Sequence, residues 1–166
     1  HMRGINAETD IVGQTRRFEG IENEHVKLVA AEVRSHLDRS RPYLLTSDDL
    51  EFIVEFDNEV PGRNIDVTLE LFNEYGIQVC MFGTLCSPEG LLARGTHRCT
   101  AIFPGNILNA GRYFVHMHFG LDQRYVLLRK ENLLTFAVED GVTARGAHFT
   151  RFAGVIHPPT AWTTQQ

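Results

Sequence analysis

Two histidines that stand one residue apart, His116 and His118, are the most chemically informative pair in this sequence. They lie in a segment that reads LNAGRYFVHMHFG over residues 108–120, where apolar and polar side chains alternate from Tyr113 onward. Strict alternation predicts a half-buried strand, because successive side chains of a strand point to opposite faces. Both imidazoles, together with Phe114, would therefore point away from the core. Imidazole can bind a metal ion or, when uncharged, exchange hydrogen bonds with hydroxyl groups.

The sequence lacks the residues that usually accompany a metal-binding pair of histidines. A cupin-like site would place a glycine further upstream of the two histidines and a glutamate soon after the second. Here Gly111 is one residue too close, and the next glutamate is Glu131. We therefore predict two outward histidines that hydrogen-bond hydroxyl groups, and no metal or other cofactor.

Further polar side chains occupy outward positions of two other predicted strands, residues 65–71 and 77–82. If these strands share a sheet with the histidine strand, their outward side chains meet on one surface. Sugars present hydroxyl groups that pair with polar side chains and C–H faces that stack on aromatic rings, and this surface supplies both kinds of partner. The alternative is an ordinary solvated sheet face, and a register shift of one residue would invert the assignment. The predicted carbohydrate-binding residues are His116, His118, Phe114, Glu70, Thr68, Asp66, Gln78 and Phe82, and the same surface would carry Cys80, Leu133 and Thr135.

The spacings offer no catalytic constellation. Asp66 and Glu70 would lie roughly 13 Å apart along one strand, too far for either glycosidase geometry. We locate no Ser–His–Asp or Cys–His arrangement, and the phosphate-binding pattern G-x-x-x-x-G-K-[ST] does not occur, so we expect neither a hydrolase nor an ATPase. Arginines in or near loops would pair with a phosphate or carboxylate on the ligand, or are ordinary surface charge. These arginines are Arg94, Arg98, Arg124 and Arg129.

The elements that position these residues are short strands separated by turn signals such as Pro61-Gly62 and Pro104-Gly105, with no convincing helical period. We predict an all-β fold, an immunoglobulin-like antiparallel β-sandwich, with a jelly-roll-like variant as the alternative. In an immunoglobulin-like order, the strands that carry the polar surface share one sheet. The predicted strands are 25–34, 50–57, 65–72, 77–83, 97–103, 112–119 and 132–138, with a separate short strand over 124–128.

The start of the histidine strand favours this topology. Leu108, Gly111 and Tyr113 form an L-x-x-G-x-Y pattern typical of a tyrosine corner, in which the tyrosine hydroxyl folds back onto the backbone just upstream. We therefore expect Tyr113 to be structural. We expect Trp162, near the C-terminus, to anchor the tail by packing, within the chain or across a dimer.

Composition excludes several classes of function. The 166 residues carry a formal net charge of −5, which provides no basic patch for nucleic acid. No apolar run approaches the roughly 20 residues that a membrane span needs. The three cysteines have no zinc-like spacing and are odd in number, which is typical of free thiols in a reducing compartment.

The chain divides into an N-terminal arm and one domain. His1-Met2 resembles a tag remnant, so we expect a domain taken from a longer protein. Residues 1–20 are predicted to be this remnant and a linker or arm, and residues 21–166 a single β-sandwich. The tail, residues 154–166, contains the sequence GVIHPPTAW, whose proline pair excludes a central strand.

The order of short motifs resembles a known family, the carbohydrate-binding C-terminal domain of the ATPase subunit of O-antigen polysaccharide ABC transporters (Wzt-type). The resemblance covers roughly residues 17–162. It is a pattern of short hydrophobic motifs without a catalytic signature, and the closing glycine-to-tryptophan tail is its most particular part. The motifs are FIVEFD at 52–57, IDVTLELFNEYG at 65–76, MFGT at 81–84, L-x-x-G-x-Y at 108–113, LTFAV at 134–138 and GVIHPPTAW at 154–162.

The resemblance implies an immunoglobulin-like sandwich that binds the exported O-polysaccharide on a concave sheet face, at the non-reducing end of the glycan. It also implies a homodimer that exchanges the C-terminal segment. The domain would lie in the cytoplasm, peripheral to the inner membrane, and would reach the membrane subunit of the transporter through an ATPase domain outside this chain. The alternative function is a structural dimerisation domain with no glycan ligand.

Overall fold

The computed structural model describes residues 12–85, 92–141, 154–156, 158 and 160–164. Within these ranges the chain forms nine strands and no helix, so no described helix could span a membrane. The strands are β1 (Arg16–Arg17), β2 (Val26–Ser35), β3 (Leu44–Leu45), β4 (Leu50–Asn58), β5 (Ile65–Asn73), β6 (Gln78–Leu85), β7 (Gly95–Phe103), β8 (Gly111–Leu121) and β9 (Tyr125–Glu139).

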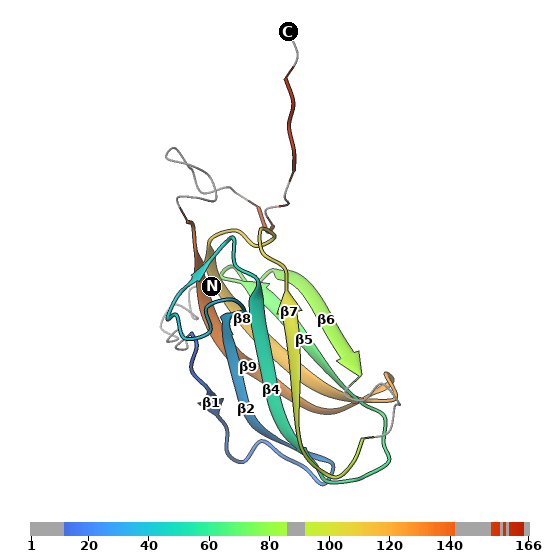
Figure 1. The fold of residues 1–166 in the computed structure, drawn as a ribbon. Coiled ribbons are helices and arrows are strands. Elements are labelled where there is room, and N and C mark those ends of the chain that lie inside the picture. The colour runs from blue at the N-terminus through green and yellow to red at the C-terminus, as the bar shows by residue number, and fades with distance from the viewer. Residues whose placement is uncertain (1–11, 86–91, 142–153, 157, 159, 165–166) are drawn as a thin grey trace.

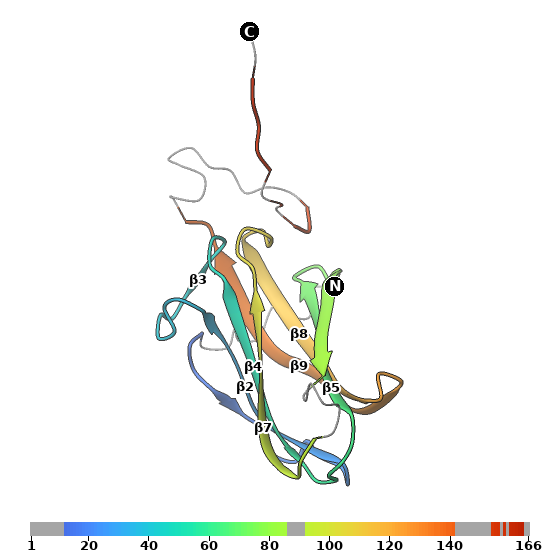
Figure 2. The same ribbon diagram turned by 45° about the vertical axis from the view of Figure 1, so that its right-hand side comes forward.

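The strands form two sheets that pack face to face (Figures 1 and 2). Sheet A has the order β1-β2-β4-β7, and sheet B has the order β3-β9-β8-β5-β6. All pairs are antiparallel except β3 with β9. The predicted β-sandwich is thus confirmed, and β5, β6, β8 and β9 share one sheet as an immunoglobulin-like order requires.

The core between the sheets follows from the alternation in the sequence. The alternating apolar residues of β4 (Leu50, Phe52, Val54 and Phe56) and of β8 are all buried. Phenylalanines such as Phe52, Phe56, Phe119 and Phe136 fill the space between the layers. The rings of Phe56 and Phe119, which come from opposite sheets, lie 4.7 Å apart. Such tilted aromatic pairs add stabilisation beyond the burial of apolar area.

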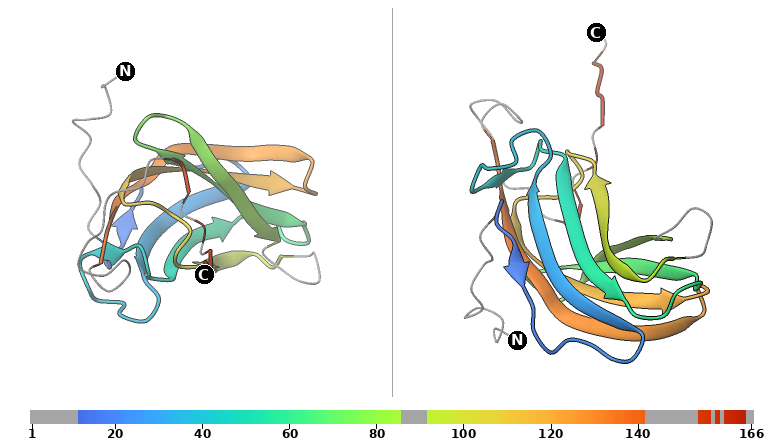
Figure 3. Two further views of the ribbon diagram at one scale, coloured as in Figure 1. Left: turned by 90° about the horizontal axis from the view of Figure 1, so that it is seen from above. Right: turned by 60° about the horizontal axis from the view of Figure 1, so that its bottom comes forward.

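The long strand β9 of sheet B contacts β2 of sheet A along one side of the sandwich (Figure 3). The guanidinium of Arg16 in β1 donates hydrogen bonds to the carbonyl oxygens of Asn132 and Leu133, at 3.2 and 3.1 Å. Nearby, the Asn23 amide donates to the carbonyl of Leu127 at 2.7 Å. These bonds satisfy carbonyl groups of β9 with donors from the N-terminal end of the domain.

The predicted tyrosine corner is present at the start of β8. The hydroxyl of Tyr113 donates a buried hydrogen bond of 2.6 Å to the carbonyl oxygen of Asn109. The tyrosine is almost fully buried, so its hydroxyl needs a partner inside the protein. Tyr113 is therefore a structural residue, as the L-x-x-G-x-Y pattern indicated.

The prediction of two separate strands over 124–128 and 132–138 is wrong, because β9 runs through both. Opposite His116, β9 carries three residues, 131–133, where a regular ladder has one. Asn132 has a φ of 53°, in the left-handed region that asparagine tolerates. Arg129 and Lys130 still pair with β8, and residues 131–133 form a bulge between two halves of β9 that both pair with β8.

Two short strands and part of the tail were not predicted in this form. Strands β1 and β3 contain two residues each, too few to produce an alternation in the sequence, and β1 lies in the predicted arm. In the tail, residues 160–164 extend away from the sandwich (Figure 1), and Trp162 is 89% exposed. Trp162 therefore does not pack against the described part of its own chain, and anchoring across a dimer stays a prediction. Cys80 is a free thiol, as expected, and Cys86 lies outside the described residues.

Candidate functional site

The antiparallel register brings the polar residues of β5 and β8 together on the outer face of sheet B. Asp66 lies opposite Gly120, Thr68 opposite His118, and Glu70 opposite His116, while Phe72 lies opposite Phe114. Residues that are directly opposite in a ladder point to the same face. Six of the predicted site residues therefore share this face: Asp66, Thr68, Glu70, Phe114, His116 and His118.

The prediction for β6 is half wrong, because a bulge at Val79 inverts the rest of the strand. Gln78 pairs with the outward Phe72 and lies exposed on the outer face, as predicted. Beyond the bulge, Phe82 pairs with the buried Leu69, so its side chain points inward. Its ring packs 5.4 Å from that of Phe103. The expectation that Phe82 offers an outward aromatic ring is therefore corrected.

The same inversion turns Cys80 toward the core and brings Met81 to the outer face. Two residues of β9 expected on the open surface are also covered. Thr135 pairs with the outward Phe114 but is buried, and Leu133, in the bulge, is fully buried.

A hollow of about 450 Å³ opens on this face at the end where β8 turns into β9. Its floor includes Asp66, Thr68 and His118. Three exposed apolar side chains also line it: Met81, Tyr125 and Val126, which are 60%, 59% and 63% exposed. The hollow therefore combines polar groups that are largely buried with apolar groups that are open to solvent.

Two glycines create the space above the polar floor. Gly120 is the cross-strand partner of Asp66, and a Cβ atom there would lie 2.5 Å from the Asp66 carboxylate oxygen Oδ1. Gly83 is the partner of Thr68, and a Cβ atom there would lie 2.7 Å from the Thr68 hydroxyl oxygen. Any other residue at either position would collide with a polar group of the floor and force it to move.

Asp66 is a buried carboxylate whose hydrogen-bonding capacity is not filled. The residue is only 7% exposed, and its Oδ2 atom has no hydrogen-bond partner in the protein. The carboxylate accepts one backbone hydrogen bond from Gln123, whose φ of 53° is unusual for this residue type. Burial raises the pKa of Asp66, and the Gln123 bond and the charge of His118 oppose this only in part.

The two histidines are held in different ways. The Nδ1 atom of His116 accepts a hydrogen bond of 2.9 Å from the backbone N–H of Asn132, so in the uncharged ring the Nε2 atom carries the proton. Burial lowers the pKa of His116, which keeps the ring uncharged at neutral pH, and the ring packs 4.8 Å from Phe72. The Nδ1 atom of His118 lies 3.4 Å from the Glu70 Oε1 atom but lacks hydrogen-bond geometry. His118 therefore retains bonding capacity beside the hollow.

Glu70 is already paired. Its two carboxylate oxygens accept hydrogen bonds of 2.7 and 3.2 Å from the two terminal nitrogens of Arg129. The hydrogen bond from Arg129 holds the pKa of Glu70 below its usual value, although burial opposes it. A carboxylate bound in this forked way holds its neighbours in place and has less capacity for a ligand than Asp66.

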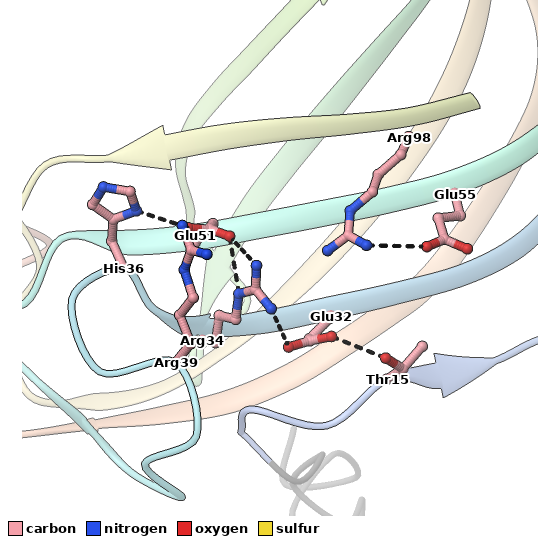
Figure 4. Close-up of polar contacts among 8 residues, drawn as sticks. All are labelled: Thr15, Glu32, Arg34, His36, Arg39, Glu51, Glu55 and Arg98. Carbon is pink, nitrogen blue, oxygen red and sulfur yellow. Dashed lines mark hydrogen bonds and ion pairs between the residues drawn. The ribbon is translucent and has the colours of Figure 1, made fainter.

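Sheet A carries a second group of buried carboxylates on its own outer face (Figure 4). Glu51 accepts hydrogen bonds from Arg34 and lies 2.7 Å from the His36 ring nitrogen Nδ1. Glu32 accepts from the Thr15 hydroxyl at 2.9 Å and contacts Arg34 at 3.4 Å. Burial would raise the pKa of Glu51, but the hydrogen bonds from His36 and Arg34 hold it below its usual value. These carboxylates are paired within the protein.

Several functional features of the outer face of sheet B escaped the sequence analysis. Phe72 was identifiable, because it continues the even-numbered outward series of β5. Met81, Tyr125 and Val126 carried no such signal, since their positions depend on the bulge and on the β8–β9 turn. Among the described residues, no group of three or more His, Cys, Asp or Glu side chains could hold a metal ion.

The four arginines singled out from the sequence have different surroundings. Arg129 binds Glu70, Arg98 contacts Glu55 on sheet A, and Arg94 donates to the backbone carbonyl of Glu59. Arg124 is exposed and lines the hollow. Arg124 is the one whose position bears on a ligand there.

The comparisons with known proteins support the fold. No protein-family model and no curated protein matches the sequence. Among solved structures, one described as the crystal structure of the C-terminal domain of Wzt matches with a TM-score of 0.70 at 15% sequence identity. The match covers 98% of this chain and 95% of that chain. The resemblance stated from short motifs is thus confirmed at the level of the fold.

Proposed function

We propose that this chain is a non-catalytic carbohydrate-binding module that recognises a bacterial surface polysaccharide, an O-antigen, at its non-reducing end for export by an ABC transporter. The observation that carries the proposal is the hollow on the outer face of sheet B, which places an unfilled buried carboxylate beneath exposed apolar side chains. The motif resemblance and the fold shared with the C-terminal domain of Wzt supply the transport context.

The chemistry of the face suits a sugar. Sugar hydroxyls donate to carboxylates and accept from ring N–H groups, and the site offers Asp66 and the uncharged His116 for these roles. The apolar C–H face of a sugar ring can stack on Tyr125 at the rim. Because the hollow is shallow and open to water, we expect weak binding at each module, strengthened by multivalency in a dimer.

Two features support a role without catalysis. Glu70 is engaged by Arg129, and along β5 it lies four residues from Asp66, or roughly 13 Å by strand rise. The two carboxyl groups therefore do not form the closely spaced pair that glycoside hydrolysis requires. We place ATP hydrolysis in a separate domain, which would connect this module to the membrane subunit at the cytoplasmic side of the inner membrane.

The C-terminal segment favours a second role, dimerisation by exchange of this segment between two copies. The Asn109 amide donates hydrogen bonds to the carbonyl oxygens of Gly154 and Ile156, at 2.7 and 3.2 Å. Beyond this attachment Trp162 is exposed, and a second copy of the chain would bury it. A purely structural dimerisation domain with no glycan ligand remains the alternative function.

The test is calorimetry of the protein with the surface polysaccharide of the producing organism, with unrelated glycans, and with the same polymer after removal of the sugar at its non-reducing end. We expect selective binding that is weakened in the His118→Ala and Tyr125→Ala variants, because both side chains line the hollow. The control is Arg98→Ala, which removes an exposed side chain from sheet A. Normal binding by both variants would overturn the assignment of the face, and no binding by the folded protein would favour the structural alternative.

A second measurement separates recognition from dimerisation. A variant that lacks residues 154–166 is examined by light scattering and by the same calorimetry. Loss of the dimer with glycan binding retained would assign the two roles to different parts of the chain. An unchanged dimer would overturn the exchange of the C-terminal segment.

A further inference from the structure

We infer that the hollow takes the terminal sugar through a pair of neighbouring uncharged hydroxyl groups that donate to Asp66, and so selects a neutral glycan end over one that carries phosphate or carboxylate. The inference rests on the proposed function and names the class of ligand for the same site.

The first support is the unfilled capacity of the Asp66 carboxylate. An ionised carboxylate has about four lone-pair positions, and in this protein one backbone N–H, that of Gln123, is identified as a donor to it. Its buried Oδ2 atom has no partner, although buried polar atoms in native proteins almost always have one. A ligand with hydroxyl donors supplies what is missing, and two hydroxyls on adjacent ring carbons match the two oxygens of a carboxylate.

The second support is the shape of the floor. Asp66 faces Gly120 on β8, and Thr68 faces Gly83 on β6. Neither glycine places a side chain between these polar groups and the hollow, which all four residues line. Close approach of a ligand to the backbone is a recognised reason for glycine within a strand. A sugar ring in the hollow would lie beside Asp66, and a turn of the carboxylate would bring its unpartnered oxygen to the sugar hydroxyls, while His118 borders the same space.

The third support is the charge of the floor. The neighbouring Glu70 is neutralised by Arg129, whose terminal nitrogens are directed at that carboxylate. Asp66 therefore leaves a negative charge in the floor, and an anionic group placed against it would be repelled in a medium of low dielectric constant. Arg124 is the cation of the lining, but it is exposed at the rim, where water and salt screen its attraction.

The test is an NMR titration of the ¹⁵N-labelled protein with uncharged methyl glycosides of mannose, glucose and galactose, and with mannose 6-phosphate and glucuronate. We expect an uncharged methyl glycoside to shift the backbone amide signals of Gly83 and Gly120. We expect each anionic sugar to bind at least tenfold more weakly. The Asp66→Asn variant should bind the methyl glycoside at least tenfold more weakly, because a hydrogen bond to a charged acceptor is lost.

Two variants control for folding. Asp57→Asn makes the same change on the outer face of sheet A, where the Asp57 carboxylate accepts from the Thr96 hydroxyl at 2.6 Å, and should leave binding unchanged. Gly120→Ala, which forces the Asp66 carboxylate to move, should also weaken binding while Asp66 itself is retained.

The outcomes separate this inference from the proposed function. Tighter binding of an anionic sugar, or normal binding by both the Asp66→Asn and Gly120→Ala variants, would overturn the inference while leaving carbohydrate recognition intact. The same holds if the polysaccharide binds but no methyl glycoside shifts Gly83 or Gly120 up to its solubility limit. If neither the polysaccharide nor any sugar binds, both proposals fail.

Discussion

The outer face of each sheet carries a buried carboxylate, and only one of the two has charged partners that fill its hydrogen-bonding capacity. On sheet A, Glu51 is 3% exposed and is surrounded by Arg34, His36 and Arg39. On sheet B, Asp66 is 7% exposed, and its Oδ2 atom has no partner. Burial is therefore similar, and the difference lies in what the protein supplies to each negative charge.

The pKa shifts of the two groups record the same difference. Burial tends to raise the pKa of both carboxyl groups, since it disfavours the charged form. For Glu51 the hydrogen bonds from His36 and Arg34 outweigh burial, and its pKa falls. For Asp66 the Gln123 backbone and the charge of His118 are insufficient, and its pKa rises. A buried carboxylate by itself does not indicate a binding site, and the proposal for Asp66 rests on its unpartnered oxygen and its place in the hollow.

The largest expected effect is on sheet A. The Glu51→Gln variant should lose about 3 kcal/mol of unfolding free energy, because it leaves the largely buried Arg34 without its ionised partner. Glycan binding should be unchanged. Urea denaturation and calorimetry check both results, with Glu55→Gln on the same strand as the control. Glu55 faces the exposed Arg98, so its loss should cost at most about 1 kcal/mol. Equal losses in the two variants would contradict the structural role of the Glu51 cluster.

Lowering the pH should change the free energy of unfolding in opposite directions through the two kinds of carboxylate. Glu51 and Glu70 have lowered pKa values, so their stabilisation is present above the usual value of 4.5 and is lost as the pH falls through their folded pKa values. Asp66 has a raised pKa, so its protonation favours the folded state as the pH falls. Urea denaturation from pH 7 to 3 should therefore show a net loss of stability that is clearly smaller in Glu51→Gln. An identical loss in that variant would contradict this account.

A smaller effect is expected for the ion pair beside the hollow. The Arg129→Gln variant should cost at most about 1 kcal/mol of unfolding free energy, since the arginine is partly exposed. The pKa of Glu70 should rise toward its usual value, because the Arg129 hydrogen bond is the main cause of its lowering. Carbon-detected NMR titration of the Glu70 carboxyl measures the change. No movement of this pKa would show that Arg129 does not control Glu70.

The smallest effect on stability, and the one of opposite sign, is expected at Asp66. The Asp66→Asn variant should have an unfolding midpoint equal to or above that of the parent at pH 7, because it removes a buried charge that the folded state accommodates poorly. The glycan affinity should fall in the same variant. Thermal unfolding followed by circular dichroism provides the measurement. A marked loss of stability would make Asp66 a structural residue like Glu51 and would remove the contrast between the two faces.

The sequence predicted most of the strands and which of their faces are buried. The alternation in residues 112–119 placed His116 and His118 on the same face, and the L-x-x-G-x-Y pattern correctly indicated the hydrogen bond of Tyr113. These inferences succeeded because they depend on local chemistry repeated every second residue. Phe82 was misplaced because one bulged residue, Val79, inverts every later side chain of β6 without leaving a pattern in the sequence.

The sequence by itself determined a β-sandwich and a polar strand face with two histidines and two acidic residues. Only the tertiary structure decided that Asp66 would keep an oxygen without a hydrogen-bond partner, while both oxygens of Glu70 would be bonded. The reason is that the register between distant segments sets the cross-strand neighbours. Asp66 lies opposite Gly120 on β8, whereas Glu70 accepts hydrogen bonds from Arg129 on β9, the strand beyond β8. Hydrophobic alternation fixes which face a side chain joins, and the packing of the strands fixes which partners it finds there.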